Sequence, residues 1–123
     1  MAEGQSERQA LQLNRGNGEM VKLTVIYGHP TDAAAFEKYY AEIHTPIAQQ
    51  IKTLRRFELA KARGAPDGSK PKYYRSADLY FDDLDHLRRV LASPEGQRAA
   101  GDLGNFATGG VTLVVSEVQE VGS

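Results

Sequence analysis

The chain has 123 residues, a formal net charge of -1 and no cysteine. This length fits one domain with a core of its own, and the apolar fraction of 41% and charged fraction of 25% are ordinary for a globular protein. The absence of cysteine excludes a disulfide framework, a thiolate metal site and a cysteine nucleophile, and it is compatible with a cytoplasmic protein. The near-neutral charge gives no reason to expect nucleic-acid binding. No apolar run approaches the roughly 20 residues of a membrane-spanning helix.

Residues 1–19 are predicted to form a polar leader ahead of a domain that spans residues 20–121. The leader contains neither the basic segment nor the apolar segment of a signal peptide. It also has no periodic apolar pattern to bury. We therefore expect it to be mobile, or to become ordered only against another subunit.

The domain is predicted to begin with a strand over residues 20–27, where apolar and polar residues alternate. A Gly-His-Pro turn ends this strand. Thr31 or Asp32 can then cap a helix, because either side chain can accept a hydrogen bond from the first helical turn.

The predicted helix carries Phe36, Tyr40 and His44 in one row, because residues four apart share a helix face. It is expected to end near His44, since Thr45 precedes a proline and is pushed away from helical geometry. Thr45 and Pro46 are well suited to start a second short helical piece. The sequence thus predicts a kinked helix–turn–helix.

Two further strands are predicted over residues 54–62 and 73–81. Phe57 and Leu59 share one face of the first. A loop rich in glycine and proline lies between the strands, so they are expected to pair as an extended hairpin.

A second helix is predicted to open at Asp82 and Asp83, which supply a cap and favourable charge at its first turn. Its expected buried stripe consists of Leu84, Leu87, Val90 and Leu91. Ser93 and Pro94 should start another short helical turn. The last predicted strand covers residues 111–115.

This order of elements, βαββαβ, predicts an α+β fold of the ferredoxin-like type, in which two helices cover one face of a four-stranded antiparallel sheet. The first, third and fourth strands carry apolar or aromatic groups on both faces. The second face of the sheet is therefore expected to be buried too, most simply in a homodimer whose sheets pack face to face.

Several motifs along the chain carry a family resemblance. They are Tyr27-Gly28-His29-Pro30, Phe36-x-x-Tyr39-Tyr40-x-x-x-His44-x-Pro46, Leu79-Tyr80-Phe81-Asp82, Ser93-Pro94-Glu95 and Asp102-Leu103-Gly104-Asn105-Phe106. With them, residues 20–121 resemble the EthD family (ethyl tert-butyl ether degradation) of the dimeric α+β barrel superfamily. The resemblance implies a homodimer with a pocket between sheet and helices in each subunit. Relatives include cofactor-independent monooxygenases, haem-handling proteins, decarboxylases and dehydratases, so the fold alone does not fix the reaction.

His44 and Asp78 are the candidate catalytic residues. An imidazole at the end of an aromatic row can transfer protons at the mouth of an apolar pocket; alternatively, it only stabilises the end of its helix. Asp78 is a carboxylate in the middle of an aromatic strand, where it must be paired or exposed. It would orient His44 if it shared the pocket side with Tyr80, and otherwise it is an exposed strand residue. These alternatives stay open.

Five aromatic residues are candidates for substrate binding: Tyr27, Phe36, Tyr40, Tyr80 and Phe106. Tyrosine hydroxyls can bind a polar ligand, although half-buried tyrosines between a sheet and a helix are common. The two phenylalanines, like Phe57, are more typical of a core than of a pocket.

No metal site or cofactor is predicted. His29, His44 and His86 lack the spacing of helical metal ligands, and no acidic residue completes a facial triad with them. The chain also lacks a glycine-rich nucleotide motif. Basic residues outnumber acidic ones over residues 52–75, which is typical either of a solvated hairpin or of a surface that attracts anions.

The function predicted on the resemblance is that of a small oxidoreductase, similar to a cofactor-independent monooxygenase. It would act on an apolar or aromatic organic substrate, with His44 as the proton-transfer group. The alternatives are a non-catalytic ligand-binding protein of a degradation pathway, a lyase on the same fold, and a haem-binding protein. The expected partners are the small organic substrate and a second copy of the chain; neither nucleic acid nor a membrane is expected.

Overall fold

The computed structural model describes residues 19–122, so the predicted leader lies almost wholly outside the described residues. Within this range, β1 (Val21–Tyr27), β2 (Arg56–Lys61), β3 (Arg75–Phe81) and β4 (Val111–Glu117) form one sheet. The strands are ordered β2-β3-β1-β4, and every neighbouring pair is antiparallel. The predicted hairpin of β2 and β3 is thereby confirmed.

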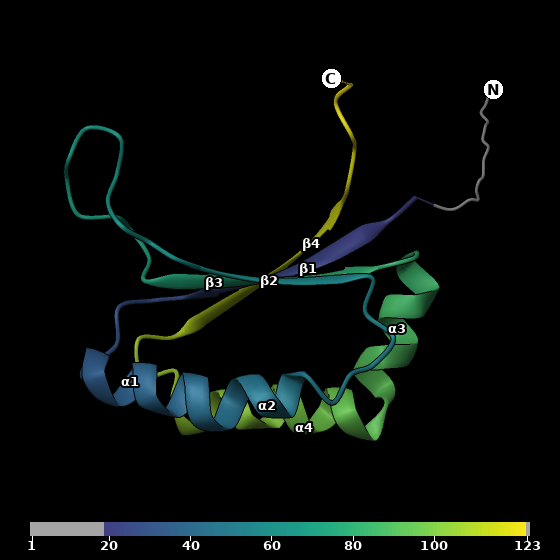
Figure 1. Ribbon diagram of the computed structural model, residues 1–123, viewed down its shortest axis with the longest axis horizontal. Coiled ribbons are helices and arrows are strands. Elements are labelled where there is room, and N and C mark those ends of the chain that lie inside the picture. Colours follow the sequence, from purple (N-terminus) through teal and green to yellow (C-terminus); the bar gives the residue numbers. More distant parts are fainter. Residues whose placement is uncertain (1–18, 123) are drawn as a thin grey trace.

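Helices cover a single face of this sheet (Figure 1). They are α1 (Ala33–Tyr39), α2 (Thr45–Ala48), α3 (Leu84–Ala92) and α4 (Pro94–Asp102). In Figure 1, α1 and α2 follow one another in a layer below the strands, α4 lies beside α2 in that layer, and α3 joins the layer to one end of the sheet. The predicted ferredoxin-like α+β fold is confirmed.

Three of these helices begin at polar caps that the sequence indicated. The Asp32 carboxylate accepts the Ala35 backbone N–H at the start of α1. Asp83 serves α3 in the same way, and the Ser93 hydroxyl accepts the N–H of Gly96 in α4. Each side chain satisfies a backbone donor that the first helical turn leaves free, which fixes where the helix starts.

The predicted break before Pro46 is wrong. Thr45 keeps helical angles, with φ -60° and ψ -45°. The chain instead widens into a π-helical turn over Tyr40–His44, in which the Thr45 N–H reaches back to the Tyr40 carbonyl. This extra residue in the turn makes room for the proline without ending the helix, and π turns of this kind are frequent at functional sites.

The core lies between the sheet and the helices. Alternate residues of β1 and β3 point into it: Val21, Leu23, Val25, Tyr27, Ala77, Leu79 and Phe81. The phenylalanine is completely buried and the tyrosine is 1% exposed. The period-two pattern of the sequence thus separated the two faces of both strands correctly, and the structure shows which of them points inward.

The predicted buried stripe of α3 is only half correct. Leu87 and Val90 are buried, whereas Leu84 is 41% exposed and Leu91 is 37% exposed. His86 takes the remaining inward position, four residues before Val90 on the same face of the helix.

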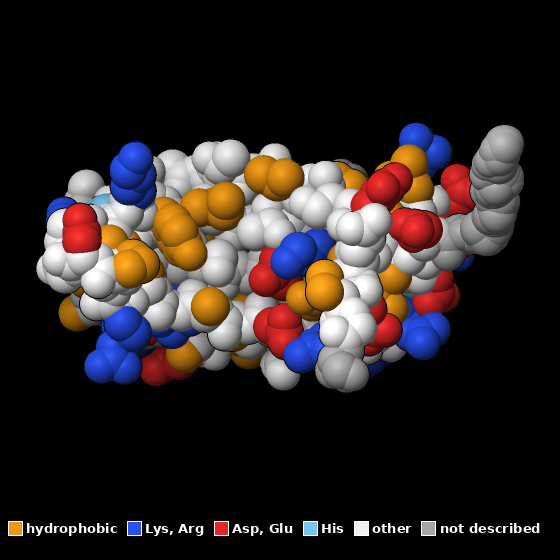
Figure 2. Space-filling view, turned by 90° about the horizontal axis from the view of Figure 1, so that it is seen from above, with side chains coloured by type: hydrophobic (Ala, Val, Ile, Leu, Met, Phe, Trp, Pro, Cys, Tyr) orange, Lys and Arg blue, Asp and Glu red, His pale blue; other side chains and the backbone are white. Residues whose placement is uncertain are grey.

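The other face of the sheet is more polar than predicted. Asp78 accepts a hydrogen bond from Thr24 and lies 3.6 Å from the Lys22 ammonium. Beside them, the Tyr80 hydroxyl donates to Glu58 at 3.1 Å. Figure 2 looks onto this side of the molecule, where charged and apolar side chains are mixed. This face therefore offers paired charges and hydroxyls in the middle of the strands, next to apolar residues.

Candidate functional site

His44 closes the π turn and is almost enclosed, with 7% of its surface exposed. Its ring lies nearly parallel to that of Tyr40, at an interplanar angle of 18° and a centroid distance of 5.8 Å. The ring of Phe106 packs against it at 4.6 Å. Contacts with these two aromatic rings leave the imidazole little freedom to rotate.

Asp102 holds one nitrogen of this ring. It is the last residue of α4, is itself 7% exposed, and places Oδ2 at 2.9 Å from His44 Nδ1. Its other oxygen accepts hydrogen bonds from the Tyr39 hydroxyl at 2.6 Å and from the Asn105 amide at 2.9 Å. The carboxylate is thus fixed by three donors, two from the first helical segment and one from the turn after α4.

These contacts keep Asp102 ionised. Burial raises the pKa of this carboxyl, but the hydrogen bonds from Tyr39, Asn105 and His44 outweigh burial, so that its pKa lies below the ordinary value. An ionised carboxylate can only accept, so the neutral imidazole carries its proton on Nδ1. Nε2 is then left with a lone pair, and no hydrogen bond to it occurs among the described residues.

A cavity of about 280 Å³ lies between the sheet and the helices, and His44 is part of its wall. Most of its lining is apolar and comes from both layers, for example Leu23, Val25 and Leu79 from the sheet. Tyr27 and Tyr40 add hydroxyls to the wall, and no Lys, Arg, Asp or Glu belongs to the part of the lining that is described. The arrangement suits an uncharged, largely apolar molecule with one polar group.

The structure brings together four of the predicted substrate-binding residues around His44. Tyr27, Phe36, Tyr40 and Phe106 form one aromatic cluster with centroid distances of 5.2 to 5.8 Å. Only the two tyrosines line the cavity. The two phenylalanines are buried in the hydrophobic core.

The predicted pairing of Asp78 with His44 is wrong. In β3, Ala77 and Leu79 face the helices, so Asp78 and Tyr80 point to the opposite side of the sheet. Asp78 pairs there with Lys22 and Thr24. The sheet therefore separates both residues from the cavity, and Asp102 occupies the place beside His44 that was predicted for Asp78.

Arg75 and Glu37 were not predicted and lie beside the same aromatic cluster. The guanidinium carbon of Arg75 is 4.9 Å from the centre of the Tyr40 ring. Its Nε and Nη2 donate to the two oxygens of Glu37, both at 3.1 Å. Glu37 also accepts from the Tyr74 hydroxyl at 2.8 Å. A bidentate pair of this kind fixes a positive charge in a defined position.

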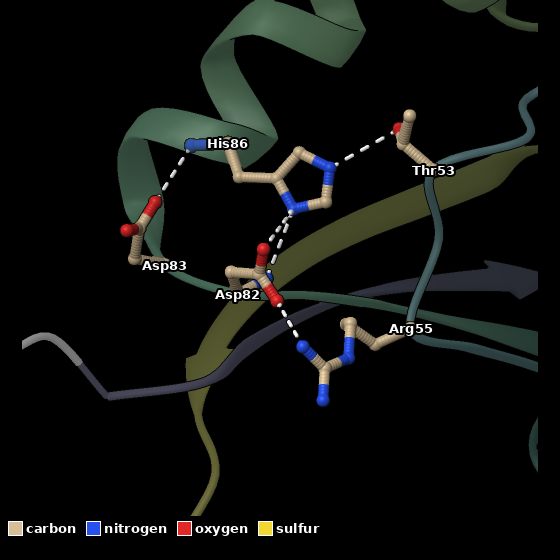
Figure 3. A network of polar contacts seen from close by, with 5 residues as sticks. All are labelled: Thr53, Arg55, Asp82, Asp83 and His86. Carbon is tan, nitrogen blue, oxygen red and sulfur yellow. Dashed lines mark hydrogen bonds and ion pairs between the residues drawn. The ribbon is translucent and has the colours of Figure 1, made fainter.

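His86 is the second buried histidine, and its surroundings differ (Figure 3). Its Nδ1 accepts the backbone N–H of Asp82 at 3.0 Å, so the neutral ring carries its proton on Nε2, which lies 3.1 Å from the Thr53 hydroxyl. Asp83 caps the helix at this residue, and Arg55 pairs with Asp82 at the surface. The network ties the segment before β2 to the start of α3.

Residues 19–122 contain no group of three or more His, Asp or Glu side chains that could hold a metal ion. None of the described helices is long and apolar enough to cross a membrane. Several basic side chains of residues 52–75 form ion pairs with acidic ones, among them Arg56 with Glu58 and Lys61 with Glu37. This pairing favours the interpretation of that stretch as a solvated hairpin.

Comparison with known proteins supports one family. The model of the EthD domain matches residues 28–110. An uncharacterized 11.0 kDa protein of the thcB-thcC intergenic region of Rhodococcus erythropolis is 42% identical over 102 residues, which are 83% of this chain and 98% of that protein. The crystal structure of an ethyl tert-butyl ether degradation family protein from Bacillus halodurans is 32% identical, covers 81% of this chain and 99% of its own, and has a TM-score of 0.76.

More distant solved structures share the fold alone. The hydroxynitrile lyase of Passiflora edulis has a TM-score of 0.67 at 12% identity, covering 87% of this chain and 100% of its own. SnoaB, a cofactor-independent oxygenase of Streptomyces nogalater, has a TM-score of 0.58 at 19% identity, covering 85% and 97%. A dimeric protein of unknown function from Bacteroides fragilis, described as having a ferredoxin-like fold, has a TM-score of 0.59 at 18% identity, covering 80% and 96%.

Proposed function

The chain belongs to the EthD family, and we propose that it is an enzyme that removes a proton from a small, largely apolar organic molecule bound between sheet and helices. His44 is the acid–base group and Asp102 is its positioning residue. The observation that carries this proposal is the pairing of Asp102 with His44 Nδ1 at 2.9 Å in the wall of an apolar cavity. A ring held in this way offers Nε2 as a base to whatever occupies the cavity.

The cavity supports the class of substrate. Its volume of about 280 Å³ suits a molecule of one or two rings, and its apolar walls favour a substrate without charge. A charged ligand would lose its hydration there without gaining an ion pair, since no charged side chain belongs to the described lining. The ligand's reactive group is expected at the end where His44 and the two tyrosines meet.

Oxidation by O₂ without an organic cofactor is the reaction that we propose first. Loss of a proton turns a phenol or an enol into an electron-rich anion, which O₂ can oxidise without help from a flavin or a metal. The fold is shared with a cofactor-independent oxygenase, SnoaB. The same proton transfer is also sufficient for a lyase, and a hydroxynitrile lyase has this fold as well. A lyase is therefore our second candidate.

We further propose that the protein is a homodimer that packs through the open face of the sheet. Apolar Ile26 and Val114 lie on this face among the polar groups, and a ferredoxin-like relative of the same fold is described as dimeric. Light scattering at micromolar concentration should give the mass of two chains; a monomer would contradict the proposal.

The absence of cysteine from the whole chain supports a cytoplasmic location.

The function is tested with a panel of neutral phenols and cyclic diketones, followed by O₂ consumption and by mass spectrometry of the products. His44→Gln keeps hydrogen-bonding capacity but cannot transfer a proton at neutral pH. His29→Gln is the matched control, because His29 bonds the Pro71 carbonyl and lies outside the cavity. Turnover should disappear only in the first variant. Equal turnover in both would contradict a catalytic role for His44, and tight binding without turnover in the wild type would favour the ligand-binding protein.

A further inference from the structure

We propose that the Tyr40 hydroxyl, backed by Tyr27 and Arg75, binds an oxygen of the substrate that becomes negatively charged when His44 removes the proton. The substrate is then a phenol or an enolisable carbonyl compound, both of which give an oxyanion on losing a proton. This inference rests on the proposed function and makes it more specific. It gives Tyr40 a role that is separate from proton transfer.

The two tyrosines and His44 share one end of the cavity. The rings of Tyr27 and Tyr40 meet edge to face at 5.4 Å, and Tyr40 stacks on the imidazole. All three residues belong to the cavity wall. A ligand that brings its reactive group to His44 must therefore bring it close to the tyrosines too. The rest of the wall has little to offer an oxygen atom, since it is almost entirely apolar.

The hydroxyl of Tyr40 is free to donate a hydrogen bond. Tyr40 is 2% exposed, and its hydroxyl donates no hydrogen bond to another residue that the structure describes. A buried hydroxyl whose proton has no acceptor is unfavourable, by about 1–3 kcal/mol. Burial raises the pKa of Tyr40, although Arg75 lowers it in part, so the proton stays on the hydroxyl at neutral pH. A ligand oxygen in the cavity would supply the missing acceptor.

Tyr27 lies behind this donor. Its pKa is raised above the usual range, first by burial and then by the charge and hydrogen bonding of Tyr40. Tyr27 thus also keeps its proton, and its ring packs edge to face on that of Tyr40. A hydroxyl that accepts from one neighbour becomes a better donor to the next, because hydrogen bonds in a chain polarise one another.

Arg75 adds a positive charge next to the Tyr40 ring. Its guanidinium lies over Tyr40, and Glu37 holds it by two hydrogen bonds. The charge sits outside the described lining of the cavity and so does not touch the ligand. A fixed charge and a fixed donor aimed at the place where negative charge develops stabilise the anion more than the neutral substrate.

The proton transfer balances without any further reactant. Nε2 of His44 takes the proton of a C–H or O–H bond, and the electron pair of that bond stays on the substrate. The charge is delocalised onto the oxygen that faces Tyr40, whose hydroxyl donates a hydrogen bond but keeps its proton. Return of a proton from His44 regenerates the starting molecule, so the step is observable as an equilibrium even without O₂.

The experiment uses para-nitrophenol as the probe, because its phenolate absorbs visible light and the neutral phenol does not. The full-length protein is titrated with it at several pH values, and the absorbance gives the pKa of the bound phenol. The wild type should bind the probe and lower its pKa. Tyr40→Phe keeps the ring and should weaken binding of the phenolate about 10-fold or more, with binding of the neutral phenol almost unchanged. Glu37→Gln, which loosens Arg75, should cost about threefold.

Tyr80→Phe is the matched control, since it removes a hydroxyl from the opposite face of the sheet. It should behave like the wild type. If the probe binds and depends on His44 but Tyr40→Phe also behaves like the wild type, the oxyanion role is wrong and the proposed function stands. If no variant, the wild type included, binds the probe, the substrate class of the proposed function is wrong, and the oxyanion role falls with it.

Discussion

Two buried histidines of this chain differ in what their ring nitrogens do. Each lies in the helical layer and is at most 7% exposed. Both nitrogens of His86 are engaged, one by a backbone N–H and one by the Thr53 hydroxyl. His44 has one nitrogen bound to Asp102, and its other nitrogen has no hydrogen-bond partner among the described residues. A histidine whose two nitrogens are both used inside the fold stabilises structure; one with a free nitrogen in a cavity wall can act on a ligand.

The size of the neighbouring space does not make this distinction. An open cleft of about 530 Å³ lies beside His86, and the cavity at His44 is about 280 Å³. The larger space is lined by polar and charged groups such as Lys52, Arg89 and Glu95, and its histidine has no free nitrogen. What identifies the site is an unused lone pair in apolar surroundings.

The largest effect is expected from His44→Gln. The loss of a general base costs typically about 10²- to 10⁴-fold in rate. Thermal unfolding should change little, because the amide can still donate to Asp102. His86→Gln should do the opposite, with turnover near that of the wild type and a lower melting temperature. Turnover and melting temperature are measured on both variants. Equal results for the two would contradict the distinction between the two histidines.

Asp102→Asn should have the next largest effect on turnover, about 10- to 100-fold. The amide oxygen can still accept from Nδ1, but the charge that favours protonation of the ring in the transition state is lost. A steady-state pH profile separates this loss of charge from a structural defect. The acidic limb of the profile, where activity is lost because the base is protonated, should move to lower pH. Asn105→Ala, which removes only one donor to the carboxylate, is the matched control and should leave that limb almost in place.

His86→Ala should reduce the free energy of unfolding by about 2 kcal/mol, because it leaves the Asp82 N–H without its acceptor and removes a buried ring. Chemical denaturation measures this. Thr53→Ala removes only the hydrogen bond between the Thr53 hydroxyl and His86 Nε2, and it should reduce the free energy of unfolding by less than half as much. A variant as stable as the wild type would show that the Asp82 N–H finds another acceptor.

The smallest effect concerns acid stability. The folded pKa of Asp102 lies below the ordinary value of 3.8, so the unfolded chain binds the proton more tightly. Its contribution is fully present above pH 3.8 and is lost as the pH falls through the folded pKa. Asp102→Asn should therefore flatten the decline of stability in this acid range. The free energy of unfolding is measured by urea titration at each pH. If it falls with pH as steeply in the variant as in the wild type, the lowered pKa is contradicted.

The fold could be predicted because its signals are local. The caps at Asp32 and Ser93 and the alternation in β1 each involve neighbouring residues. The partner of His44 could not be predicted in this way, since Asp102 is 58 positions away and only the packing of α4 against the first helical segment brings it close. One signal was available: Asp102 belongs to the last of the motifs that carry the family resemblance.

The error over Asp78 has a different cause. The alternation in β3 correctly separated Asp78 and Tyr80 from Leu79. It could not reveal that the helices lie on the Leu79 side and that the cavity is on that side too. The π turn was missed because the rule that a residue before proline avoids helical angles is a preference, and one extra residue in the turn overcomes it.

The most direct test of the account is heteronuclear NMR of the histidine ring nitrogens in their neutral forms. The two buried rings should show opposite tautomers, with the proton on Nδ1 in His44 and on Nε2 in His86. Addition of a bound phenol should shift Nε2 of His44 and leave both nitrogens of His86 unchanged. A proton on Nε2 of His44, or a ligand that shifts His86 instead, would contradict the claim that His44 offers a free lone pair to the cavity.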